Sequence, residues 1–162
     1  MKWKIAILVL AATGSALAVP ASVTPSDLVG TWRCGPTVMQ RPEVTVTTSD
    51  ETTNASDGTY TSRGTIVTTL PDKHVTTVLV RSSGTWELKG DIVRTHVQHG
   101  EFLSASDPSI TKEEGQRLQD DQLRKKSVFE DRILEFTGTR SRSIPINSMY
   151  KSAVVETGCE RI

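Results

Sequence analysis

From about residue 30 onward, the chain consists largely of short runs in which hydrophobic and polar residues alternate. Between residues 91 and 99, Val93, Thr95 and Val97 share one face of an extended chain, and Arg94 and His96 share the other. A period of two residues predicts β-strands that turn one face to a core and the other to solvent. That arrangement is typical of antiparallel sheets built from consecutive strands.

Nine segments rich in Thr and Val are predicted as strands, because turn sequences separate them. They are 30–35, 43–53, 59–70, 74–81, 84–89, 91–99, 128–137, 139–144 and 151–161. Asn54–Gly58 and Lys89–Asp91 offer the positive-φ positions that tight hairpins need. Gly64 falls in the middle of a strand and predicts a bend of the kind that small barrels use for curvature. The sequence therefore predicts an all-β, antiparallel up-and-down barrel of about eight to nine strands.

The charged segment 107–126 breaks the strand pattern. Thr111 and Glu114 are spaced as in a capping box, which predicts a short helical insertion near 110–126, with the helix itself near 112–125. Gly115 weakens this helix by about 1 kcal/mol. Because the only apolar residues are Leu118 and Leu123, we expect a solvated decoration that touches the domain by one narrow edge at most. The alternative is a mobile lid or an element that contacts a partner.

Residues 1–18 have the three-part layout of a cleavable secretory signal. Lys2 and Lys4 precede the apolar run 5–12, and Ala16-Leu17-Ala18 forms a small-x-small cleavage site. The alternatives are a membrane anchor or a buried strand, but a span needs roughly 20 apolar residues. We therefore expect an exported protein, periplasmic or secreted, with one domain over 19–162. No other segment is apolar enough to cross a membrane.

Charge gives no reason to expect a polyanionic partner. The whole chain has 19 basic and 19 acidic residues, and loss of the signal removes two lysines and no acid, which leaves a net charge of −2. Nucleic acid is therefore not expected as a partner.

Cys34 and Cys159 are the only cysteines and lie near the two ends of the predicted domain. An oxidising compartment favours a disulfide between them, and the alternative is two free thiols. Closing a loop of about 126 residues stabilises by roughly 4–5 kcal/mol in the chain-entropy model.

Gly30-Thr31-Trp32, at the start of the first predicted strand, carries the Gly-x-Trp signature of lipocalin-type barrels. The chain resembles the small exported lipocalin-like proteins of bacteria. The resemblance implies that the first strand pairs with the last and that an Arg near the end of the chain packs across the Trp. If Cys34 bonds Cys159 across an antiparallel pair, Trp32 faces Arg161 and the four residues form a barrel-closing seam. The alternative is that Trp32 is an ordinary core aromatic and Arg161 a solvated terminal residue.

A lipocalin-like barrel also implies an interior cavity for a ligand. Tyr60, Trp86, Arg94 and His96 are candidate ligand-binding residues, if the face that carries Arg94 and His96 lines the interior. In the alternative, that face is solvated and Val93, Thr95 and Val97 make the core. The cost of burying an unpaired Arg favours this alternative.

No pattern indicates catalysis, a metal or a cofactor. His96 and His99 project from opposite faces of a strand, and no Gly-x-Ser-x-Gly motif is present. The first hypothesis is a binding protein for a small apolar or amphipathic ligand. The second is an inhibitor or immunity-type factor of the cell envelope that inserts a loop into a partner protein, with loops 37–42, 103–109 and 144–150 as candidates. The third is a hydrolase-type enzyme.

Overall fold

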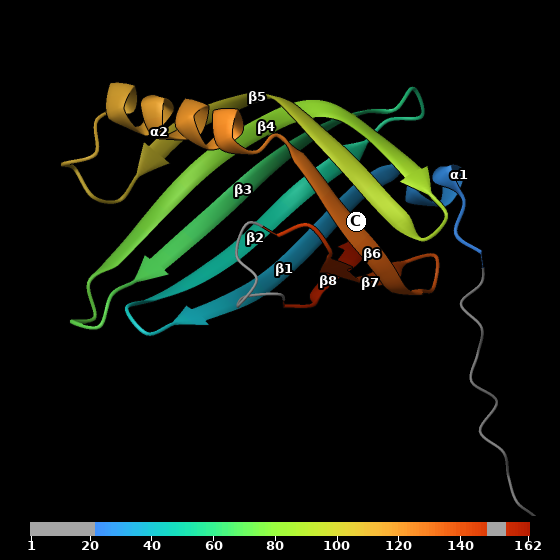
Figure 1. Cartoon of the computed structure of the whole chain (residues 1–162), viewed down its shortest axis with the longest axis horizontal. Coiled ribbons are helices and arrows are strands. Elements are labelled where there is room, and N and C mark those ends of the chain that lie inside the picture. The colour runs from blue at the N-terminus through green and yellow to red at the C-terminus, as the bar shows by residue number, and fades with distance from the viewer. Residues whose placement is uncertain (1–21, 149–154) are drawn as a thin grey trace, which may run out of the picture.

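The fold is a closed barrel of eight antiparallel strands in up-and-down order, as the alternating pattern predicts (Figure 1). The computed structural model describes residues 22–148 and 155–162, so the predicted signal lies outside the described residues. The strands are β1 (Gly30–Arg41), β2 (Val44–Asn54), β3 (Thr59–Thr69), β4 (Val75–Lys89), β5 (Ile92–Ala105), β6 (Val128–Phe136), β7 (Arg140–Pro145) and β8 (Thr157–Arg161). Two helices, α1 (Pro25–Leu28) and α2 (Lys112–Lys125), complete the described structure.

Two predicted strands, 74–81 and 84–89, are in fact the single strand β4. The β4–β5 ladder shifts register between Ser83 and Gly84. A Cβ atom at Gly84 would lie 2.0 Å from the carbonyl oxygen of His96. Glycine thus permits a bulge with close backbone approach, and the strand continues where the sequence suggested a turn.

Two other strands are longer than predicted. β1 continues through Gly35 and Pro36 to Arg41, because a register shift between Cys34 and Thr37 absorbs the irregular pair. β5 continues to Ala105, beyond the predicted end at His99. As a result, the predicted loop 37–42 belongs almost entirely to β1, and the first three residues of the predicted loop 103–109 belong to β5.

The barrel wall is uneven in height. Strands β1–β5 have 11 to 15 residues, whereas β6, β7 and β8 have nine, six and five. β6 therefore pairs only with the Ile92–His96 part of β5 and leaves the rest of that edge without a strand partner. The long strands extend past the short ones toward the end where α2 lies (Figure 1).

Helix α2 has the predicted bounds and covers this free edge of β5. The side-chain oxygen of Gln116 accepts a hydrogen bond from the Phe102 amide (3.0 Å), and its Nε2 donates to the Gly100 carbonyl (2.8 Å). Gly115 packs on the Phe102 ring, where a Cβ atom would come within 2.5 Å. The helix thus meets the barrel along one edge, as expected, but that edge makes specific bonds that protect β5.

The opposite end of the barrel is closed by α1 and a compact core. Leu28, Tyr60, Trp86 and Ile133 form the buried cluster. At the start of α1, the carboxylate of Asp27 accepts hydrogen bonds from the backbone amide (2.8 Å) and the hydroxyl (2.7 Å) of the N-cap Thr24, which fixes the first turn. In the part of the chain that the structure describes, no helix is both long and apolar enough to span a membrane.

Candidate ligand cavity

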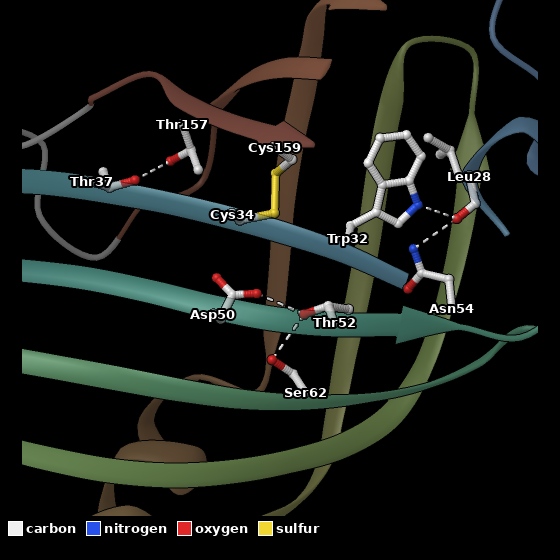
Figure 2. Close-up of a disulfide and its surroundings, with 10 residues drawn as sticks. All are labelled: Leu28, Trp32, Cys34, Thr37, Asp50, Thr52, Asn54, Ser62, Thr157 and Cys159. Atoms are coloured by element: carbon white, nitrogen blue, oxygen red, sulfur yellow. Dashed lines mark hydrogen bonds between the residues drawn. A yellow bond between two sulfur atoms is a disulfide. The ribbon is translucent and has the colours of Figure 1, made fainter. Parts of the chain in front are cut away.

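The disulfide between Cys34 and Cys159 is present, as predicted, and joins the first and last strands (Figure 2). Pairing of β1 with β8 is limited to three residue pairs, among them Trp32 with Arg161. This is the register expected from the disulfide. The hydroxyls of Thr37 and Thr157 add a contact of 2.8 Å between the two strands.

Arg161 connects three parts of the closed end. Its guanidinium lies 4.6 Å from the centre of the Trp32 ring. It donates hydrogen bonds to the carbonyls of Val29 (2.8 Å), Gly138 (3.2 Å) and Asp27. This one side chain therefore ties the last strand to α1, to the start of β1 and to the β6–β7 turn.

A second pair of hydrogen bonds fixes α1 from inside the barrel. The indole Nε1 of Trp32 donates to the Leu28 carbonyl (3.0 Å), and the side-chain amide Nδ2 of Asn54 donates to the same oxygen (3.2 Å) (Figure 2). The closed end is thus held by directional bonds as well as by apolar packing.

Next to this closed end lies an interior cavity of about 300 Å³. An apolar part is formed by Leu28, Trp32, Val93 and Ile133, and the disulfide forms part of the wall. The rest of the lining is polar and comprises Asp50, Thr52, Asn54, Thr95, Asp131, Ser141, Ser143 and Thr157. The volume is at the lower end of the range for small-molecule sites.

Two carboxylates face this cavity, from strands that are not neighbours in the barrel. Asp50 on β2 accepts a hydrogen bond from the Thr52 hydroxyl (2.7 Å), which is itself 2.9 Å from the Ser62 hydroxyl (Figure 2). Burial raises the pKa of Asp50, and the Thr52 and Ser62 hydroxyls partly oppose this rise. Burial also raises the pKa of Asp131 on β6, where Lys126 acts to lower it and Asp50 to raise it further.

Three of the four candidate ligand-binding residues, Trp86, Arg94 and His96, line one open depression of about 450 Å³, but Tyr60 does not, and none of the four lines the interior cavity. Tyr60 and Trp86 are buried in the core cluster, where the Trp86 indole donates to the Ala55 carbonyl (3.2 Å). Arg94 and His96 are exposed on the outer face and do not line the interior cavity, so the hypothesis that placed them there needs correction. Arg94 lies 3.8 Å from Glu87 and 3.6 Å from Glu130. Val93, Thr95 and Val97 turn inward instead. This is the alternative stated in the sequence analysis, which the cost of burying an unpaired Arg favours.

Asp50 and Asp131 were missed by the sequence analysis, although a signal for them exists. Asp50 alternates with Thr52 and Asn54, and Asp131 alternates with Ile133, on faces that the barrel turns inward. A carboxylate in the inward phase of an alternating strand conflicts with simple core packing. Such a conflict between local chemistry and fold is expected at functional positions.

A larger open depression of about 690 Å³ lies outside the barrel, across β1, β7 and β8. Two of its cations are already paired: Arg33 with Glu160 (3.5 Å), and Arg142 with Glu135 (3.6 Å). This outer depression is open, and its charges are largely paired. The interior cavity is therefore the stronger candidate site.

No protein-family model matches the chain, and no curated protein is detectably similar to it in sequence. Within residues 22–148 and 155–162, no group of three or more His, Cys, Asp or Glu side chains could hold a metal ion.

Proposed function

We propose that this protein is an exported, lipocalin-like binding protein that holds a small amphipathic ligand inside its barrel. The observation that carries the proposal is the interior cavity, with its apolar part at Leu28, Trp32, Val93 and Ile133 and its polar part beyond them. Small-molecule sites typically combine apolar walls with a few converging polar groups. A ligand with one apolar and one polar end matches this division.

The disulfide supports an exported location, because such bonds persist in oxidising compartments and are rare in the cytosol. Together with the signal-like layout of residues 1–18, it favours the periplasm or the extracellular medium. The Gly-x-Trp start and the strand pairing around Trp32 and Arg161 support the lipocalin-like assignment.

The alternative, an inhibitor that inserts a loop into a partner protein, has less support. Loop 37–42 is mostly part of β1, loop 103–109 begins within β5, and the third, 144–150, lies partly outside the described residues. A barrel packed solid with side chains would have favoured the inhibitor, but the interior contains a cavity.

Native mass spectrometry of the protein purified from its own secretory compartment tests the proposal, together with binding of the uncharged fluorescent probe N-phenyl-1-naphthylamine. We expect a co-purifying small molecule or saturable probe binding. The variant Thr95→Phe, which places a ring in the cavity, should abolish binding. His96→Phe adds a ring of the same size to the outer face of the same strand and should bind normally. Absence of both bound ligand and probe binding in the wild-type protein would refute the proposal.

A further inference from the structure

We propose that the cavity is selective for an organic cation, namely a protonated amine attached to a small aromatic or aliphatic group. The ammonium would lie between Asp50 and Asp131, with the apolar group against Trp32, Val93 and Ile133. This inference rests on the proposed binding function and specifies the chemistry of its ligand.

The charges of the cavity are one-sided. Its 14 lining residues include the two carboxylates and no Lys, Arg or His. Asp131 is partly buried, and among the described residues its carboxylate makes neither a side-chain hydrogen bond nor an ion pair. A partly buried carboxylate without a partner carries a cost, and a ligand cation that binds it would offset that cost.

Lys126 is the cation of the protein that acts most directly on Asp131, but it is engaged elsewhere. Its ammonium donates hydrogen bonds to the backbone and side-chain oxygens of Asn147, the latter at 2.9 Å, and lies 5.2 Å from the centre of the Phe129 ring. It does not line the cavity. The position between the two carboxylates is therefore left for a charge from outside the chain.

A second polar group without a partner lies on the same side of the barrel as Asp50. Tyr60 is only 5% exposed, and its hydroxyl has no hydrogen-bond partner among the described residues. The hydroxyl lies toward Ser82, near enough to influence its raised pKa but without a hydrogen bond of normal geometry. Ser82 pairs across the ladder with Ser62, which belongs to the hydroxyl network of Asp50. Tyr60 and Ser62 share one face of β3, so the unpaired hydroxyl lies on the side of the barrel that carries the Asp50 network, although Tyr60 itself does not line the cavity.

An organic amine fits this cavity better than a metal ion or an anion. The two carboxylates share the cavity with an aromatic and three aliphatic side chains, which are poor ligands for a metal. An anion would be repelled by both carboxylates and would find no cation in the lining. A neutral apolar molecule would leave the two carboxylates unpaired.

Isothermal titration calorimetry with three indole compounds separates these possibilities. Tryptamine carries an ammonium, tryptophol a hydroxyl and indole-3-propionate a carboxylate, on the same ring and a two-carbon arm. With the disulfide-bonded mature protein at pH 7.5, we expect tryptamine to bind at least tenfold more tightly than tryptophol, and indole-3-propionate not to bind. Asp50→Asn and Asp131→Asn should each weaken tryptamine binding at least tenfold and leave tryptophol binding unchanged.

Glu135→Gln is the control variant, because it removes one carboxylate from the outer, exposed face of the same strand as Asp131. It should bind both compounds as the wild type does. Equal affinity for tryptamine and tryptophol would overturn the cation selectivity and leave the binding function standing. If none of the three compounds binds, the cation selectivity fails, and the co-purified ligand and the uncharged probe decide separately whether the binding function stands.

Discussion

At the scale of single residues, the interior carboxylates are where this barrel departs most from a simple core. Asp50 and Asp131 occupy inward positions of β2 and β6, and burial raises the pKa of both. A group with a raised folded-state pKa stabilises the fold at low pH and loses that contribution as the pH rises through the raised value. Without ligand, the charged carboxylates therefore destabilise the protein at neutral pH. Binding sites commonly carry such a cost.

Asp131→Asn should accordingly stabilise the ligand-free protein at pH 7, because it removes a charge that has no partner. We expect the melting temperature to rise by a few degrees at pH 7. The gain should vanish at pH 3, below the ordinary aspartate value of 3.8, where the wild-type carboxyl is protonated in both states. Scanning calorimetry at the two pH values measures this. A melting temperature that falls at pH 7 would show that the carboxylate has a stabilising partner.

Arg161 is the residue whose geometry is most difficult to replace. Its planar guanidinium reaches three carbonyl oxygens and lies over the Trp32 ring. A lysine ammonium is a compact donor and cannot reproduce this set.

We expect Arg161→Lys to lower the free energy of unfolding by about 2 kcal/mol, since hydrogen bonds to charged groups contribute about 1.5–3 kcal/mol each and lysine keeps some of them. Urea denaturation measures the change. Arg132→Lys is the matched control, because Arg132 is half exposed and its 3.4 Å contact with Asp91 is a surface ion pair worth about 0–1 kcal/mol. Equal effects of the two substitutions would show that the carbonyl bonds of Arg161 contribute little.

At the scale of secondary-structure elements, α2 takes the place of a strand along the part of β5 that does not pair with β6. Gln116 satisfies one donor and one acceptor of the exposed β5 backbone, and the absence of a side chain at Gly115 brings the helix close enough to do so. Gly115 is therefore required for docking, although glycine weakens a helix by itself.

Gly115→Ala tests which of these effects is larger. Helix propensity alone predicts a gain of about 1 kcal/mol. The Cβ atom, however, would lie 2.5 Å from the Phe102 ring, and overpacking typically costs about 1–3 kcal/mol. We expect lower stability and faster hydrogen exchange at the Phe102 amide. Gln122→Ala, at an exposed position of the same helix, should leave both unchanged. Slower exchange at Phe102 in Gly115→Ala would show that propensity dominates.

The barrel was predictable from the alternating pattern, the helix bounds from the charged segment with its capping box, and the disulfide from the two cysteines, because each follows from local sequence or from the cysteine count. It did not predict that β4 is continuous, since the bulge at Gly84 depends on the approach of the His96 carbonyl from a neighbouring strand. For a similar reason, the sequence did not decide which face of β5 turns toward the interior. Both faces of that strand carry apolar residues, and only closure of the barrel decides that Val93 rather than Arg94 lines the interior.

At the scale of the whole molecule, closure of the barrel depends on a short contact. The β1–β2 ladder pairs ten residues of each strand, whereas the β1–β8 ladder pairs only Trp32–Cys34 with Cys159–Arg161. The disulfide lies within this short ladder and also forms part of the cavity wall. Stability and ligand binding should therefore depend on the same bond.

Replacing both cysteines, Cys34→Ser with Cys159→Ser, should therefore affect both properties. Because the bond closes a long loop, the chain-entropy model gives a loss of roughly 4–5 kcal/mol as an upper value, and part of that loss is enough to lower the melting temperature by several degrees. Hydrogen exchange should accelerate at β8 before the other strands, and binding of the uncharged probe should weaken as the cavity wall opens. Chemical reduction of the wild-type protein should reproduce all three effects, which excludes an effect of the serines themselves. An unchanged melting temperature with slow exchange at β8 would mean that Arg161 and the three ladder pairs suffice to close the barrel.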